Sequence, residues 1–242
     1  MTKTAGERLL QKWSGWIKGP IHDQVLTLAF ERDVYEEYQG ILGRASEEAR
    51  GGTIFHNWLS GTYVTSVSVA VRRSVDHNKR TVSLMRLMEE IRDHPTAMTR
   101  ERYLSLFSDQ RMRDHIGERE FDKWGSDVAD PAVVDKDIGE LIEATKDTKH
   151  YVDKRVAHHD GRVEEVVSVT WGELNGAIDA IEKAFVRYYG LIAVAGYVID
   201  DITHSPWQHI FEAPWVEPRE EMQRMRRLIE EFHDAPGDIS SE

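Results

Sequence analysis

The stretch from Asp130 to Arg162 constrains the fold most, because one run contains a helix start, a long helical period and a helix stop. Asp130 can cap a helix, since its carboxylate accepts a free backbone N–H, and Pro131 suits the first helical position. Gly161 is a suitable residue to end the helix, because glycine tolerates the positive φ that often follows a last helical turn. The residues between them that recur at spacings of three and four are Ile138, Ile142, Thr145, Lys149, Val152 and Val156. The pattern predicts one long helix with these residues along one stripe.

The end of this stretch gathers ionisable side chains. Arg155 stands three residues before His158 and four before His159, so their side chains can meet on a helix. A permanent cation beside an imidazole can polarise a phosphate and transfer protons near neutral pH. The alternative interpretation is that a basic last turn complements the negative end of the helix dipole. The full set of ionisable residues here is Asp153, Lys154, Arg155, His158, His159 and Asp160.

Composition excludes several classes of function. The 242 residues include 43 acidic and 31 basic side chains, a net charge of −12, which argues against a general nucleic-acid coat or a binder of anionic membranes. A small basic cleft remains compatible with that charge. The absence of cysteine excludes disulfides, thiolate catalysis and zinc–cysteine sites. The longest apolar run, 191–199, is far shorter than the roughly 20 residues that a membrane span needs. With no signal-peptide pattern at the start, a cytoplasmic protein is expected.

The rest of the chain also has mostly helical character, and only residues 160–170 are convincingly β-prone. Ser83 is a predicted cap, and Thr170 with Glu173 forms a capping box. The fold class predicted is all-α, with about seven or eight helices and four long ones able to form a bundle. Three parts are expected: a helical extension over 1–20, a bundle domain over 21–203, and a linker, amphipathic helix and disordered tail over 204–242. The predicted helices lie within 1–19, 21–44, 53–78, 83–94, 97–124, 130–161, 170–201 and 221–232.

The segment 53–78 is ambiguous, because its valines alternate with the period of a strand while its apolar residues also fit a helix. Strands rarely exceed about ten residues, so its length favours a helix. This helix ends in Arg72, Arg73 and Asp76. These side chains either face solvent, as charged helix ends commonly do, or reach the same cleft as His158.

Three motifs together resemble one known family. The long helix ends in D-K-x-x-A-H-x-D, an earlier helix carries W-x-x-x-x-Y and ends R-R-x-x-D, and T-W-x-E-L follows. Over roughly residues 22–201 the chain resembles the HEPN superfamily, with its abortive-infection, Abi U-type branch the nearest match. The residues that carry the resemblance are Trp58, Tyr63, Arg72, Arg73, Asp76, Asp153, Lys154, Ala157, His158, Asp160, Thr170, Trp171, Glu173 and Leu174.

The resemblance implies an α-helical bundle that dimerises and places an Arg-x4–6-His motif from each protomer in a shared cleft. Many such proteins are metal-independent endoribonucleases, in which a ribose 2′-OH attacks the adjacent phosphate, a reaction open to RNA and not to DNA. The present chain departs from that motif, because no Arg stands five to seven positions before His158 or His159. We therefore expect Arg72 or Arg73, from the neighbouring helix, or Arg155 to contact the phosphate.

The first hypothesis is thus a dimeric endoribonuclease of antiviral defence, acting in abortive infection or as part of a toxin–antitoxin pair, with no metal and no cofactor. His158 is the expected general acid or base, and an aspartate would orient an imidazole. The expected catalytic residues are His158, Arg155, His159, Arg73 and Asp153, and the expected substrate-binding residues are Arg72, Lys154 and Asp76. The expected partners are an RNA substrate, a second copy of the chain, and an antitoxin or other defence protein, with no membrane and no DNA.

Two other hypotheses remain. One is a catalytically inactive HEPN-like module that binds RNA or protein as a sensor, scaffold or antitoxin partner; the altered Arg–His spacing and the acidic charge favour it. The other is a metal enzyme using His158, His159 and Asp160. Consecutive residues of a helix point about 100° apart, so one metal site using both histidines is disfavoured.

Overall fold

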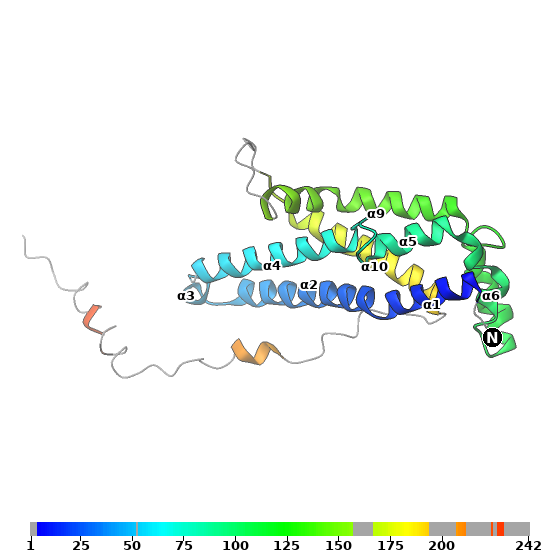
Figure 1. Ribbon diagram of the computed structural model, residues 1–242. Helices are drawn as coiled ribbons and strands as arrows, with labels where there is room; N and C mark the ends of the chain where they lie inside the picture. The colour runs from blue at the N-terminus through cyan, green and yellow to red at the C-terminus, as the bar shows by residue number, and fades with distance from the viewer. Residues whose placement is uncertain are drawn as a thin grey trace, which may run out of the picture. The chain divides into compact units, whose positions relative to one another are not determined.

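The structure is a computed structural model that describes residues 4–51, 53–156, 167–193, 207–211, 224 and 227–229. The chain divides into two compact units, Met1–Thr203 and His204–Glu242. The first unit contains the helical bundle (Figure 1). In the second, the described residues include the 3-10 helix η4 (Trp207–Phe211) and helical residues at 224 and 227–229. Most of the predicted helix over 221–232 therefore lies outside the described residues.

Helices begin where the sequence supplies caps. The Asp130 carboxylate accepts a hydrogen bond from the Ala132 N–H at 2.9 Å, and the Ser83 hydroxyl accepts one from the Arg86 N–H at 3.1 Å. These bonds satisfy N–H groups that a helix start leaves without partners. The helices that build the first unit are α1 (Ala5–Lys18), α2 (Pro20–Arg44), α3 (Glu47–Arg50), α4 (Thr53–Ser74), α5 (Leu84–Asp93), α9 (Pro131–Tyr151) and α10 (Trp171–Ala193).

Four long helices, α2, α4, α9 and α10, form the bundle, and α10 packs against each of the other three. Helix α1 continues the direction of α2 and also contacts α5 and α10 (Figure 1). Its Trp13 and Ile17 are fully buried, so α1 is part of the packed core. The described residues contain no β-strand, only isolated bridges at Thr99–Val128 and Gly125–Ala129. The predicted all-α bundle is confirmed.

Helix α4 resolves the ambiguity of segment 53–78. It is a continuous helix of 22 residues, as its length predicted. Tyr63, Val67 and Val71 are buried at spacings of four, whereas Val69, which a strand would place on the same face, is only half-buried. No described helix is long and apolar enough to cross a membrane.

Between α5 and α9 the chain folds into short helical segments that close one end of the bundle. Tyr103, Phe107 and Phe121 are buried there, and the Tyr103 ring centroid lies 5.5 Å from that of Phe107 and 5.3 Å from that of Phe121. Thr99 and Asp109 each cap a new helix, which divides the region. The segments are η1 (Pro95–Ala97), α6 (Arg100–Leu104), α7 (Gln110–Met112), η2 (Arg113–Gly117) and α8 (Glu118–Asp122).

The buried stripe of α9 differs from the predicted one at Ile142, which is 45 % exposed. A period of 3.6 residues allows either Leu141 or Ile142 to follow Ile138, and packing against α10 and α5 selects Leu141. The prediction was therefore wrong at Ile142, and also at Lys149, because the neighbouring Thr148 is the buried residue there. The buried stripe of α9 and the turn that continues it consists of Val134, Ile138, Leu141, Thr145, Thr148 and Val152.

Candidate functional site

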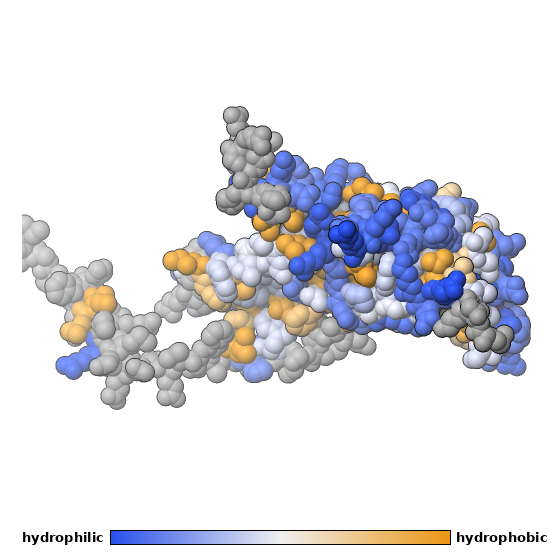
Figure 2. All heavy atoms as spheres, viewed as in Figure 1, coloured by the Kyte–Doolittle hydropathy of each residue, from blue (hydrophilic) through white to orange (hydrophobic). Residues whose placement is uncertain are grey.

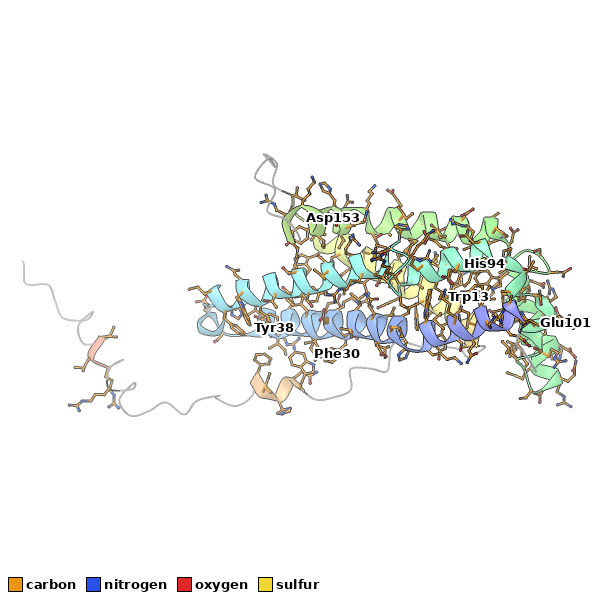
Figure 3. The ribbon with its side chains drawn as sticks, viewed as in Figure 1. Trp13, Phe30, Tyr38, His94, Glu101 and Asp153 are labelled. Carbon is orange, nitrogen blue, oxygen red and sulfur yellow. The ribbon has the colours of Figure 1, made fainter. Side chains whose placement is uncertain are left out.

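The structure brings together three of the residues singled out in the sequence. Arg72, in the last turns of α4, has its Nε 3.0 Å from the Asp153 Oδ1 and its Nη1 3.6 Å from the Asp76 Oδ1. Asp153 lies 81 residues further along the chain, where the helix formed by α9 ends above α4 (Figure 3). The three side chains are between a quarter and just under a half exposed, so the cluster is accessible to solvent.

Asp153 belongs to a π-helical turn, η3 (Val152–Val156), that directly continues α9. Buried Val152 anchors this turn, and its N–H points to the carbonyls of both Thr148 and Lys149, where the helix changes its hydrogen-bond pattern. Single π-turns within helices are rare and frequently accompany functional sites. The turn carries Lys154 and Arg155, which are half-buried and exposed respectively.

The histidines of the candidate site, His158 and His159, lie outside the described residues, as do Asp160 and Gly161. The expected meeting of Arg155 with either imidazole therefore stays a prediction. Among the described residues, no three His, Asp or Glu side chains converge as metal ligands.

Arg73 lines a cavity that does not include Arg72. This cavity of about 500 Å³ lies between α2, α4 and the loop that follows α4, and Asp23, Gln24 and Thr81 also line it. Consecutive positions on a helix point in directions about 100° apart, which explains why only Arg72 of the pair meets η3. Asp76 belongs to both places, because it pairs with Arg72 and also lines the cavity that contains Arg73.

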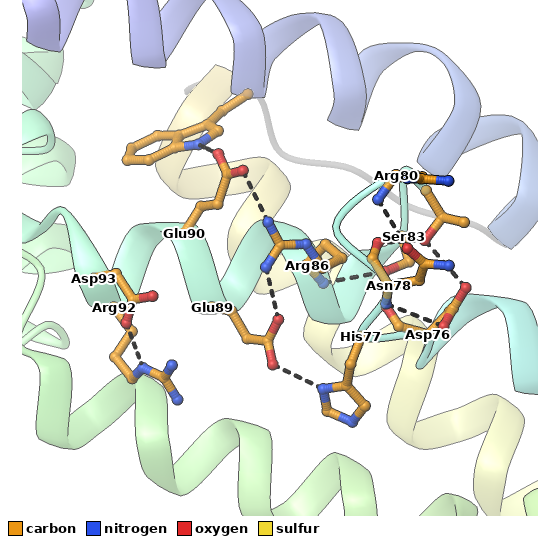
Figure 4. Close-up of polar contacts among 12 residues, drawn as sticks. Asp76, His77, Asn78, Arg80, Ser83, Arg86, Glu89, Glu90, Arg92 and Asp93 are labelled. Carbon is orange, nitrogen blue, oxygen red and sulfur yellow. Dashed lines mark hydrogen bonds and ion pairs between the residues drawn. The ribbon is translucent and has the colours of Figure 1, made fainter.

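The loop after α4 is held by hydrogen bonds centred on Asp76 (Figure 4). One carboxylate oxygen accepts the Asn78 N–H at 3.1 Å, and the other accepts the Thr81 hydroxyl at 3.1 Å. The Ser83 hydroxyl donates to the Asp76 carbonyl at 2.6 Å. Asp76 is thus a turn-forming residue as well as a partner of Arg72.

A row of charged side chains continues from this loop along α5 (Figure 4). His77 lies 2.7 Å from Glu89, whose other oxygen accepts from Arg86 at 3.1 Å. Arg86 also donates to Glu90 at 3.2 Å, and Glu90 accepts from the indole N–H of Trp13 at 3.0 Å. The row connects α1 to the loop beside Arg72.

Glu90 makes this row sensitive to acid. Burial raises the pKa of its carboxyl, but hydrogen bonds from Lys12 and Trp13 and the charges of Lys12 and Arg86 outweigh burial and hold the pKa below 4.5. A carboxyl whose pKa is lower in the folded state stabilises the fold when the pH is above its unfolded-state pKa. This stabilisation is lost as the pH falls through the folded-state pKa.

We expect Glu90→Gln to lower the free energy of unfolding by about 1.5–3 kcal/mol at pH 7, because charge-assisted hydrogen bonds are lost. The difference from wild type should shrink as the pH falls below the unfolded-state pKa, about 4.3, and through the lowered folded-state pKa. Urea denaturation at several pH values measures it, with the exposed Glu143→Gln as control. A difference that stays constant throughout the acid range would contradict this role for the Glu90 charge.

The aromatic residues of the family-like motifs have a structural place. Trp171, which opens α10 after the Thr170 capping box, stacks on Tyr35 and Tyr63 with ring centroids 4.9 and 5.6 Å away. Tyr35 and Tyr63 stack on each other at 4.1 Å. Trp58, by contrast, is 62 % exposed. Two of the three motif aromatics therefore join α4 to α2 and α10.

Sequence reasoning missed the residues along α9 that precede the cluster. Lys146, Lys149 and His150 line a cavity of about 260 Å³ together with Asp153. Their spacing in the sequence is that of one helix face, which was the available signal. The predicted stripe includes Lys149, which obscures this signal.

Comparison with known proteins agrees with the motifs. The family model described as AbiU2, of the HEPN type, matches residues 10–213, which cover most of the chain. No curated protein and no solved structure matches this chain. The matched range includes α4, α9, the π-turn and α10. On its motifs, its all-α bundle and this match, the chain belongs to the AbiU2 family of abortive-infection-related HEPN domains.

Proposed function

We propose that this protein is a metal-independent endoribonuclease of antiviral defence, acting in abortive infection or in a toxin–antitoxin pair. The observation that carries the proposal is the ion-pair cluster of Arg72, Asp76 and Asp153 at the turn that leads into the histidines. The cluster fixes the start of the segment carrying His158 against a second helix. Catalysis depends on this kind of positioning, since small displacements of a reacting group cost large factors in rate.

The proposed reaction forms a bond between the ribose O2′ and the adjacent phosphorus and breaks the bond from phosphorus to O5′. One imidazole accepts the 2′-OH proton, and a protonated imidazole supplies a proton to the departing O5′. We assign the first role to His158; His159 or the His158 of a second copy is the candidate for the other. Asp160 could orient one of the rings.

The negative charge that builds up on the phosphate needs a cation close to it. Arg155 and Lys154, on η3, are the nearest basic residues in sequence. Arg72 uses its Nε and Nη1 on carboxylates, which leaves Nη2 for a phosphate oxygen. Arg73 would contact the RNA from its own groove.

A second copy of the chain is the proposed partner, and the start of α4 is the proposed contact. Ile54, Phe55 and Trp58 are 90 %, 45 % and 62 % exposed, and the last two rings lie 5.9 Å apart. Figure 2 shows hydrophobic residues at the end of the unit where α4 begins. Contiguous exposed apolar side chains commonly mark an interaction site.

We therefore expect the wild type to sediment as a dimer and Trp58→Ser to weaken dimerisation by at least about tenfold, because buried aromatics dominate interface energies. Analytical ultracentrifugation over a concentration series measures this. Leu106→Ser, which removes a 50 % exposed apolar side chain outside α4, is the control and should leave the dimer intact. A Trp58→Ser dimer as stable as that of wild type would exclude this surface.

The second candidate is a catalytically inactive module that binds RNA or a defence protein as a sensor, scaffold or antitoxin partner. The favouring observation is that Arg72 already lies between two carboxylates, which offset its charge. No Arg at the family spacing precedes the histidines to replace it.

Incubation of the purified protein with single-stranded RNA in EDTA separates the two. The ribonuclease proposal predicts discrete fragments at a rate proportional to protein concentration. RNA retained by the protein but left intact, with and without EDTA, would support the inactive module instead.

A further inference from the structure

The cavity beside Asp153 is lined by both basic and apolar side chains. It lies between α9 and the end of α4, and its volume of about 260 Å³ is just below the roughly 300–1,000 Å³ typical of ligand sites. Val75 and Ile142 supply apolar wall, and the 45 % exposure of Ile142 becomes understandable as part of that wall. Lys146, Lys149 and His150 line the groove from α9.

These basic residues occupy one face of α9. Lys146, Lys149, His150 and Asp153 follow spacings of three, four and seven, which place side chains on one side of a helix. His77 reaches the same groove from the loop after α4. Side chains from two elements thus converge on one volume, next to the Arg72–Asp153 ion pair.

The charges of the groove are partly uncompensated. Lys146 pairs with Glu143, His77 with Glu89, and Asp153 with Arg72. The side chains of Lys149 and His150 have no hydrogen-bond or ion-pair partner within the described residues. In a chain with 43 acidic and 31 basic residues, acidic partners are abundant, so unpaired basic groups beside a cavity indicate room for an external anion.

We propose that this groove binds one nucleotide of single-stranded RNA, with its phosphate on Lys149 and His150 and its sugar or base against Ile142 and Val75. The inference rests on the proposed function, and it adds a second phosphate contact beside the reacting one. Asp153 belongs to both the groove and the ion-pair cluster, so the bound nucleotide would lie beside Arg72. A volume of this size suits one unstacked nucleotide and not a duplex.

The test measures binding and cleavage separately. Binding of a fluorescein-labelled 12-nucleotide single-stranded RNA is followed by anisotropy at several salt concentrations, in the His158→Ala background so that the RNA stays intact. Lys149→Ala in that background should weaken binding about tenfold and reduce the slope of log K against log salt by about 0.7, the value for one phosphate contact on a single strand.

Lys136→Ala is the matched control. It removes the same charge from the same helix, but its Nζ lies 3.9 Å from Glu140 and outside the groove. Binding should be within about twofold of the parent, because a distant paired charge makes no phosphate contact. Circular dichroism of both variants checks the fold, and alanine preserves helix propensity at both positions.

Equal losses in the two lysine variants, or no loss in either, would overturn the groove as a phosphate site. If wild type cleaves RNA and Lys149→Ala binds normally, the groove assignment fails while the ribonuclease proposal stands. If wild type cleaves no RNA but Lys149→Ala alone weakens RNA binding, the groove stands and the catalytic proposal fails. An absence of RNA binding in the parent overturns the groove in either case.

Discussion

Replacing His158 by alanine is expected to reduce RNA cleavage in EDTA by about 10²–10⁴-fold, the usual contribution of a general acid or base. We expect the ion-pair cluster to be retained, because Arg72, Asp76 and Asp153 pair with one another. Initial rates of cleavage of a short labelled RNA, at saturating protein, measure the effect.

His159→Ala is the informative comparison, because it removes the neighbouring imidazole and leaves His158 in place. If one imidazole performs the main proton transfer, the two variants should differ by at least about tenfold in rate. Equal activity of wild type and His158→Ala would remove His158 from the mechanism, whatever His159→Ala does.

Replacing Arg72 by methionine should lower the cleavage rate by about 10²-fold, because the ion pair that holds the π-turn is lost and the histidine segment is displaced. Stability should fall by less than about 1 kcal/mol, since ion pairs this exposed contribute little. The Arg72 and Asp153 side chains are 33 % and 43 % exposed. Cleavage kinetics and urea denaturation on the same preparation give both numbers.

The matched control is Arg92→Met. Arg92 is 32 % exposed and pairs with Asp135 at 3.3 Å, so it too links a neighbouring helix to α9, but near the opposite end of that helix. It should lose similar stability and keep its cleavage rate. If both arginine variants lost activity equally, the effect would be general to α9 and the special role of Arg72 would be contradicted.

Much of the fold was predictable because it depends on local chemistry. The caps at Ser83, Asp130 and Thr170 form the hydrogen bonds their residue types predict. The length of segment 53–78 predicts the helix that α4 (Thr53–Ser74) forms, because length decides where two periodicities compete. Membership of the HEPN class was carried by the spacing of motif residues on two helices, and the family match bears it out.

The details of the site needed tertiary structure. The sequence brought Arg72, Arg73 and Asp76 to one helix end, but only packing of α4 against α9 decides that Arg72 meets Asp153 while Arg73 faces a separate cavity. The exposure of Ile142 follows from the same packing choice. The π-turn at Val152–Val156 has no sequence signature comparable to a cap, so it could not be foreseen.

The central claim is that this bundle cleaves RNA without metal, with the 2′-hydroxyl of the RNA itself as the nucleophile. The most direct measurement first maps the cut in a short RNA in EDTA, then replaces the nucleotide on the 5′ side of that cut by its 2′-deoxy form. We expect the all-ribose strand to give a product ending in a 2′,3′-cyclic phosphate and the single 2′-deoxy substitution to abolish the cut. Cleavage that persists at the deoxy position, or no cleavage of any RNA in EDTA, would contradict it.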